Sequence, residues 1–330
     1  MYAEFYGLAA RPFQLTPDAR FFFESTVHRQ AMAYMVYGLH HAEGFIIITG
    51  EVGAGKTILV DNLLATINEN SFIAAKIVTS QLGGDDLLHM VAGGFGIAKE
   101  GLAKGSLLQR ISDFVLAQHR NGKRVLLIVD EAQNLSFEAL EELRMLSNIV
   151  VDKTMALQSF LLGQPQFRAI LGSPGLDQLR QRVTAAYHLG PLNEVETRAY
   201  IEHRLRRAEW KGDPHFTEAS FPVIYQHTEG VPRRINTLCS RLLLYGFLEQ
   251  LHTLTASSVD KVANDLREEI AVVTSPSPVL AVDGEQGALG AALPAVVERL
   301  TALEKNVDRH DRLIRRAIEI AAHYFQGERQ

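Results

Sequence analysis

The feature that most constrains the fold is the run from Gly50 to Thr57, which reads GEVGAGKT. It matches the P-loop pattern, in which the backbone N–H groups of a glycine-rich loop surround a phosphate. The run directly follows an apolar segment, Phe45–Thr49, and opens a helical pattern over 58–67. A glycine-rich turn that matched the pattern by accident would not need this context. The sequence therefore predicts a phosphate-binding loop between a strand and a helix.

The loop residues have distinct expected roles in nucleotide binding. Lys56 is expected to reach the β- and γ-phosphates, and the Thr57 hydroxyl is expected to hold Mg²⁺. The positive end of the following helix adds to the attraction for phosphate. The predicted nucleotide-binding residues are Gly50, Glu51, Val52, Gly53, Ala54, Gly55, Lys56, Thr57, Ile58 and, from a later strand, Asp130.

Two acidic residues follow a second buried strand. The apolar run Val125–Val129 ends in Asp130 and Glu131. An acid at the first position holds the water shell of Mg²⁺ in other P-loop enzymes, so Thr57 and Asp130 are the predicted metal ligands. Glu131 is placed to accept a proton from a water that attacks the γ-phosphate. The alternative is that both acids merely begin the next loop, but their combination with the P-loop favours an ATPase with ATP and Mg²⁺ as ligands.

Strand-like and helical patterns alternate over the first part of the chain. The apolar runs are Phe45–Thr49, Phe72–Thr79, Val125–Val129, Ala156–Leu162 and Ala186–Leu189. Runs this apolar indicate strands buried on both faces of a parallel sheet. From about Glu194 only helical patterns remain, over 194–210, 217–228, 231–250 and 255–269. The predicted fold class is α/β with a parallel sheet, followed by an all-helical domain.

The last part of the chain has a different composition. Residues 274–294 are rich in Pro, Gly, Ser and Ala, which is typical of a linker. Apolar residues then recur at heptad spacing from Val296 to Tyr324, which fits either a short coiled coil or an amphipathic helix that packs on its own domain. The predicted divisions are an N-terminal segment (1–42), a nucleotide-binding domain (43–192), a helical domain (193–270), a linker (271–295) and an amphipathic or coiled-coil helix (296–326).

Charge and cysteine usage exclude several classes of protein. A net charge of −5 argues against a protein that mainly coats nucleic acid. The single cysteine, Cys239, cannot form an internal disulfide and favours a reducing cytoplasm. No run approaches the ~18 apolar residues of a membrane span, and the N-terminus lacks a signal-peptide pattern. We therefore expect a soluble cytoplasmic protein whose contact with the inner membrane, if any, is peripheral.

Further motifs complete a resemblance to a known family. The P-loop and the Asp130–Leu135 segment (DEAQNL), together with LGQP (162–165), QR (181–182) and GVPR (230–233), resemble an AAA+ ATPase. Within that class the chain resembles the general secretion pathway A (ExeA-like) family, and most closely the secretion ATPase found beside exosortase and PEP-CTERM exopolysaccharide genes. The motifs typical of that subfamily are FYGL (5–8), PF (12–13), TPD (16–18), ELRMLSN (142–148) and QSFLLGQP (158–165). The resemblance covers about residues 2–270.

The resemblance implies three catalytic residues in addition to Glu131. Gln164 corresponds to sensor 1, which positions the lytic water; relatives often have Asn or Thr there, and a cap for the following helix is the alternative. Arg182 resembles the arginine finger that completes a neighbouring subunit's site, with Arg180 as its rival and ordinary surface charge as the alternative. Arg233 resembles sensor 2, which reaches from a helical lid, here the helical domain, to the γ-phosphate.

Local sequence adds to the interpretation of Arg233. Gly230 and Pro232 set a turn that starts a helix, so Arg233 lies in its first turn. A cation there opposes the helix dipole, which indicates an anionic partner. A structural role for Arg233 and the adjacent Arg234 is the alternative. The Pro12–Phe13 segment is expected either to pack near the adenine or to be a hydrophobic latch without ligand contact.

Three functions remain open from the sequence. The resemblance implies a homo-oligomeric ATPase with protein partners in an envelope export or exopolysaccharide system. The first alternative is a duplex-DNA-bound regulator of the transposition type, with Arg204, Arg206, Arg207 and Lys211 as candidate contacts. The second is a scaffold that binds ATP without turnover, against which the intact P-loop lysine and acidic pair argue.

Overall fold

The computed structural model describes residues 1–16, 18–41, 44–67, 71–79, 83–98, 101–151 and 154–274. The predicted heptad helix at 296–326 lies outside these residues, as does the linker from residue 275 on. Helix α12 (Ala256–Thr274) continues past residue 271, where we predicted the linker to begin.

The chain divides into two compact units. The larger unit comprises Ala10–Glu209 and Ile224–Thr237, and the smaller unit comprises Met1–Ala9, Trp210–Val223 and the described residues from Leu238 on. These boundaries differ from the predicted ones in two ways. The N-terminal segment is shared between the units, and the first helix of the predicted helical domain, α9 (Glu194–Arg207), belongs to the larger unit.

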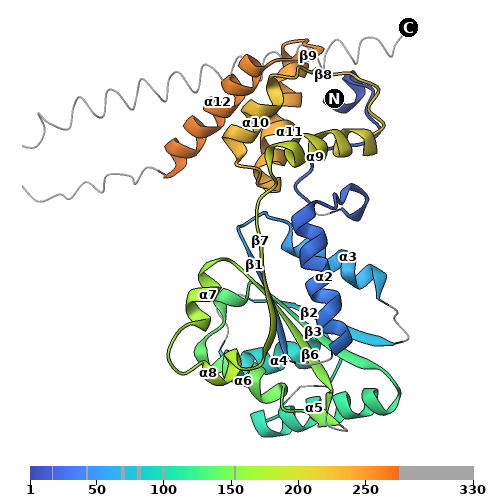
Figure 1. Cartoon of the computed structure of the whole chain (residues 1–330), viewed down its shortest axis with the longest axis vertical. Coiled ribbons are helices and arrows are strands. Elements are labelled where there is room, and N and C mark those ends of the chain that lie inside the picture. Colours follow the sequence, from blue (N-terminus) through green and yellow to red (C-terminus); the bar gives the residue numbers. More distant parts are fainter. Residues whose placement is uncertain are drawn as a thin grey trace, which may run out of the picture. The chain divides into compact units, whose positions relative to one another are not determined.

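A five-stranded parallel sheet forms the centre of the larger unit (Figure 1). Its strand order is β2-β3-β6-β1-β7. The strands are β1 (Phe45–Gly50), β2 (Phe72–Val78), β3 (Arg124–Asp130), β6 (Leu157–Gly163) and β7 (Val183–Leu189). All five predicted strands are present, and β1 and β6 are buried along their whole length, as continuous apolar runs predict. A short antiparallel pair, β4 (Val150–Val151) with β5 (Thr154–Met155), was not predicted.

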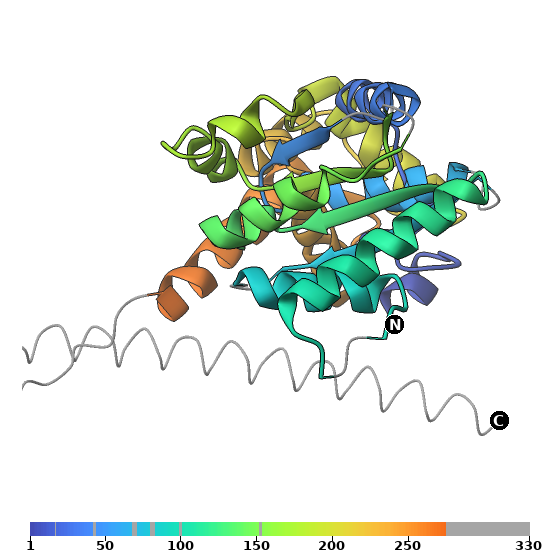
Figure 2. The same ribbon diagram turned by 90° about the horizontal axis from the view of Figure 1, so that it is seen from below.

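Helices cover both faces of this sheet. One face packs against α4 (Gly84–Gly94), α5 (Lys104–Arg120) and α6 (Phe137–Leu146). The other packs against α2 (Thr26–His41) and α3 (Lys56–Thr66). Strand β1 shows how the pleat divides the core, because Phe45 and Ile47 belong to the first cluster and Ile46 and Ile48 to the second. In the turned view of Figure 2 the strands lie between α2 (dark blue) and α5 (teal).

The parallel arrangement determines which predicted residues meet. Strands β1, β3 and β6 end at Gly50, Asp130 and Gly163, so the segments that follow them meet at one edge of the sheet. Arg182 instead precedes β7, and its carbonyl accepts a hydrogen bond from the N–H of Phe45 (2.8 Å) at the start of β1. Arg182 therefore lies at the opposite edge of the sheet from its own chain's P-loop.

The smaller unit contains the N-terminal FYGL motif. The ring of Phe5 stacks on His252 with 4.9 Å between centroids, and the Tyr6 hydroxyl donates to the carbonyl of Leu251 (3.0 Å). The unit also holds a two-residue parallel pair, β8 (His215–Phe216) with β9 (Thr253–Leu254). The prediction of an all-helical domain is wrong to this extent, because two-residue strands are too short to show a period of two.

The remaining elements are short or flank the site. They are α1 (Tyr2–Phe5), η1 (Ala19–Phe21), η2 (Ala132–Asn134), α7 (Gln166–Leu171), α8 (Asp177–Arg180), α10 (Ser220–Thr228) and α11 (Pro232–Leu248). Among the described residues, no helix combines the length and the apolar character that crossing a membrane requires.

Candidate nucleotide-binding site

The predicted P-loop connects β1 to α3, which begins at Lys56. Gly53 and Gly55 have φ values of 83° and 102°, in the left-handed region that favours glycine. A Cβ atom at Gly53 would lie 2.2 Å from the Cβ of Arg233, and one at Gly55 would lie 2.6 Å from Nε2 of His28. These two glycines are required both for the backbone conformation and for the close approach of the two side chains.

The side chain of Lys56 is held inside the loop. Its ammonium group donates to the carbonyls of Gly50 (2.7 Å) and Glu51 (3.0 Å), and the residue is 6% exposed. Burial lowers the pKa of Lys56, while Glu131, Asp130 and Glu51 raise it. The cation thus lies among acidic side chains at the carboxyl edge of the sheet.

Thr57 and Asp130 meet as a pair. The Thr57 hydroxyl donates to Oδ2 of Asp130 (3.0 Å), whose Oδ1 accepts from the backbone N–H of Glu131 (2.9 Å). The described residues contain no cluster of three or more His, Cys, Asp or Glu side chains that could hold a metal alone. Mg²⁺ is commonly bound by one or two protein oxygens together with phosphate and water, so the hydroxyl–carboxylate pair fits this ion.

Glu131 adopts a backbone conformation that is unusual for a residue other than glycine, with φ 56° and ψ 39°. Thr79 holds this turn, because its hydroxyl donates to the carbonyls of Asp130 (2.9 Å) and Glu131 (2.7 Å). The amide of Asn134 in turn donates to the carbonyl of Thr79 (3.0 Å). Sequence reasoning missed Thr79 and Asn134 as supports; the available signal was a polar residue directly after β2 and another inside the DEAQNL motif.

Gln164 lies beside the Glu131 carboxylate. Its side-chain Nε2 donates to Oε2 of Glu131 (3.2 Å), and its backbone N–H donates to Oε1 of Gln133 (2.9 Å). The alternative of a helix cap finds no support, because the N-cap of α7 is Pro165 and no side chain caps this helix. Gln133 was not among the predicted site residues, although it forms part of this cluster.

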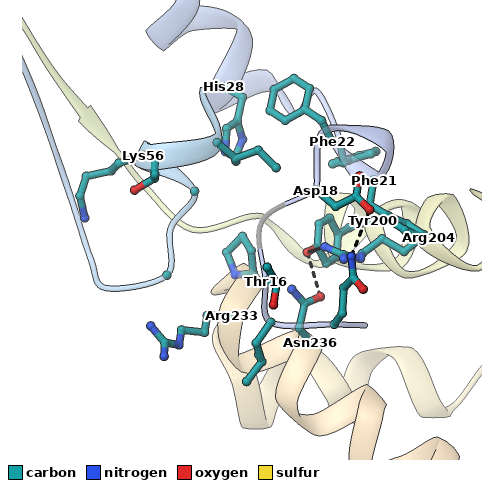
Figure 3. Close-up of a pocket in the computed structure, with 18 of the residues that line it drawn as sticks. Thr16, Asp18, Phe21, Phe22, His28, Lys56, Tyr200, Arg204, Arg233 and Asn236 are labelled. Atoms are coloured by element: carbon teal, nitrogen blue, oxygen red, sulfur yellow. Dashed lines mark hydrogen bonds between the residues drawn. The ribbon is translucent and has the colours of Figure 1, made fainter. Parts of the chain in front are cut away.

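Arg233 also lies near the P-loop. Its backbone N–H donates to the carbonyl of Gly53 (3.2 Å) from the first turn of α11. Its exposed side chain lines the same cavity as Lys56 (Figure 3). The guanidinium group has no hydrogen-bond or ion-pair partner among the described residues, whereas the adjacent Arg234 pairs with Glu229.

Neither candidate finger lies at the P-loop of its own chain. The Arg182 guanidinium donates to the hydroxyl of Ser147 (2.8 Å). The Arg180 guanidinium donates to the carbonyl of Leu171 (2.8 Å), the last residue of α7, and also pairs with Asp177. Arg180 thus connects α7 to α8, which leaves Arg182 with fewer structural contacts.

The P-loop opens into a cavity of about 310 Å³. Lys56 and Arg233 line one side, and Phe21, Tyr200 and Asn236 line another (Figure 3). The segment after Phe13 also lines it, through Gln14, Leu15, Thr16 and Asp18. Phe13 itself is 1% exposed and does not line the cavity, so it has the position of a latch while the residues that follow it reach the cavity.

A polar network supports this far side of the cavity. The Tyr200 hydroxyl donates to Oδ1 of Asn236 (2.9 Å) and accepts from Nη1 of Arg204 (2.8 Å). Arg204 is 6% exposed, lies over the ring of Phe21 at 5.0 Å, and donates from Nε to the carbonyl of Pro12. Its assignment as a surface contact for DNA is therefore wrong, because the side chain is buried in the network.

His28 connects α2 to the P-loop. It is 4% exposed, and its Nδ1 lies 2.7 Å from the Ser25 hydroxyl. Burial lowers the pKa of His28 to about 4, although a hydrogen bond with the Ala54 backbone and the charge of Glu196 oppose the shift. The neutral imidazole therefore packs against the loop at physiological pH.

One family model and one curated protein show what this chain is similar to. Residues 39–171 match the family model of the AAA domain. The chain is 36% identical over 267 residues to the general secretion pathway protein A of Aeromonas hydrophila, an alignment that covers 81% of this chain and 48% of that protein. The chain thus spans about half the length of this curated relative. An AAA domain implies nucleotide binding.

Solved structures show a similar fold at low identity. The Cdc6p structure from Pyrobaculum aerophilum aligns with a TM-score of 0.61 at 14% identity, covering 80% of this chain and 74% of that chain. The Aeropyrum pernix ORC1 protein, solved in complex with DNA, aligns with a TM-score of 0.59 at 14% identity, covering 81% and 72%. The predicted α/β P-loop fold of AAA+ proteins, with a helical C-terminal region, is confirmed.

Proposed function

We propose that this chain, an AAA domain protein homologous to general secretion pathway protein A, binds ATP with Mg²⁺ and hydrolyses it. The observation that carries the proposal is the meeting of three groups at one sheet edge. These are the Lys56 ammonium in its glycine-rich loop, the Thr57–Asp130 pair, and the Glu131 carboxylate with two amide donors. A scaffold without turnover would not need the third group.

Each group has a role in the proposed reaction. The loop N–H groups and Lys56 bind the phosphates, and Thr57 and Asp130 would hold Mg²⁺, which neutralises phosphate charge when bound. Glu131 accepts a proton as the oxygen of a water bonds to the γ-phosphorus and the bond from that phosphorus to the bridging oxygen of ADP breaks. Gln164 supports Glu131 and the water, and Arg233 contacts the γ-phosphate.

The position of Arg182 supports an oligomer. Because this side chain lies at the sheet edge opposite its own P-loop, it can act on a phosphate only in a second copy of the chain. We infer that Arg182 is the finger for a neighbouring site, where an arginine stabilises the charge on the transferring phosphoryl group. Arg180 is a weaker candidate because its guanidinium is bonded to α7 and α8.

We assign the ATPase to an envelope export system. The support is the homology of this chain to general secretion pathway protein A, which extends over 81% of this chain and 48% of that protein. The finer assignment, to an exosortase-associated exopolysaccharide system with protein partners there, rests on the motif resemblance alone. The DNA-bound alternative loses one of its four candidate contacts, because Arg204 is buried, whereas Arg206 forms an exposed pair with Glu202.

Steady-state ATPase measurements test the proposal. Glu131→Gln should bind ATP and lose turnover, and Lys56→Ala should lose binding. Arg182→Ala should bind ATP and turn over slowly, and mixing it with Glu131→Gln should restore part of the activity if the site is shared. Wild-type turnover in Glu131→Gln would contradict the assignment of the base. A large, salt-sensitive stimulation by duplex DNA would favour the DNA-bound alternative.

A further inference from the structure

Gln133 connects two residues of the proposed catalytic cluster. It lies in the single turn η2 that follows Glu131. Its Nε2 donates to Oε2 of Glu131 (2.6 Å), and its Oε1 accepts from the backbone N–H of Gln164 (2.9 Å). One side chain thus bridges the segment after β3 to the segment after β6.

The surrounding backbone determines how the Gln133 amide is oriented. The N–H of Gln164 directly follows β6 and can only donate, so the group that faces it must be the amide oxygen of Gln133. The amide nitrogen must then face Glu131. Gln133 therefore presents a donor to the carboxylate, and a flipped amide would lose both hydrogen bonds.

The two oxygens of Glu131 consequently differ. Oε2 accepts hydrogen bonds from the amides of both Gln133 and Gln164. Oε1 accepts no hydrogen bond from any residue that the structure describes. A carboxylate held through one oxygen can present the other, with its lone pairs, to a water molecule.

We propose that Gln133 is a positioning residue that fixes the Glu131 carboxylate through Oε2 and leaves Oε1 to act as the base. The inference rests on the proposed ATPase function. Losing the donor of Gln133 should therefore leave the carboxylate free to rotate and misdirect the base.

The variant Gln133→Ala tests this role in the full-length protein. We expect the kcat for ATP hydrolysis to fall about 10- to 100-fold, because part of the contribution of a general base is lost, while the KM for ATP changes less than about threefold. A role in folding alone would change the midpoint of thermal unfolding, and a role in nucleotide binding alone would change the KM, without lowering kcat at saturating ATP.

The matched control is Gln109→Ala. Gln109 donates to the carboxylate of Asp113 (2.9 Å) on the exposed surface of α5. Its replacement by alanine therefore removes the same type of hydrogen bond at a place away from the cavity. The kcat and KM of this control variant should equal those of the wild type. If Gln133→Ala does not fold, as judged by thermal unfolding, the isosteric Gln133→Glu replaces it, since this variant cannot donate when ionised and should show the same losses at neutral pH.

The outcomes separate the two proposals. A wild-type protein that binds ATP without turning it over would contradict the proposed function itself. An active wild type with an unchanged kcat in the Gln133 variant would overturn the positioning role. A loss of ATP binding in that variant would also overturn it, because Gln133 would then support the loop and not the base.

Discussion

Gly53→Ala tests whether the P-loop and the first turn of α11 meet as described. The φ of 83° at Gly53 is strained for alanine, which costs about 1 kcal/mol. The new Cβ would lie 2.2 Å from the Cβ of Arg233, whereas carbon atoms need roughly 3.5 Å or more. The two segments must therefore separate by more than about 1 Å.

The structure sets bounds on the free energy that this separation costs. The carbonyl of Gly53 accepts the N–H of Arg233, one of the first N–H groups of α11, which have no partner inside the helix. Losing this bond costs about 1 kcal/mol, and relieving the overlap adds about 1–3 kcal/mol. Together with the backbone strain we expect Gly53→Ala to lower the free energy of unfolding by about 3–5 kcal/mol.

Gly122→Ala is the control that measures the cost of backbone strain without the steric overlap expected at residue 53. Gly122 has a similar φ of 73°, but a Cβ there meets no atom within 4 Å, so only the cost of about 1 kcal/mol applies. The assay is urea unfolding of both full-length variants without nucleotide, compared at equal slopes. A difference between the variants below about 0.5 kcal/mol, within ordinary mutational scatter, would refute the contact between the P-loop and α11.

Three further predictions follow from buried or charged groups. His28→Gln should remove an acid sensitivity, because the pKa of His28 is lowered to about 4 in the folded state and the unfolded chain therefore takes up the proton first. The wild type should lose up to roughly 3 kcal/mol of unfolding free energy as the pH falls from about 6.5 toward 4, and the variant should lose less. Urea unfolding of both proteins at these two pH values measures the losses, and an equal loss in the two proteins would contradict the prediction. Arg204→Ala should lower the free energy of unfolding by about 2–4 kcal/mol, because Pro12 and Tyr200 lose a buried donor, whereas Arg206→Ala, which breaks an exposed pair with Glu202, should cost less than about 1 kcal/mol. Chelation of Mg²⁺ with EDTA should abolish turnover and Mg²⁺ should restore it, whereas turnover that persists in EDTA would exclude the Thr57–Asp130 pair as a required metal site.

The sequence alone was sufficient for the features that are local in the chain. The five buried strands are continuous apolar runs, and this pattern is required wherever both faces of a strand are covered. The P-loop and the Asp130–Glu131 pair directly follow two of these strands. The motifs and the apolar runs together were therefore enough to predict a parallel sheet with a nucleotide-binding site at one edge.

Tertiary structure decided what depends on residues distant in sequence. The bridge from Glu131 through Gln133 to Gln164 forms only because β3 and β6 are neighbours in the sheet, and no spacing in the chain encodes that pairing. Arg204 has the sequence character of a surface cation, yet packing against Phe21 and Pro12 buries it. Hydrophobic periodicity predicts which face of a helix or strand is covered, but it does not identify the distant segment that covers it. The packing of distant segments determined which side chains hold the proposed catalytic residues in place.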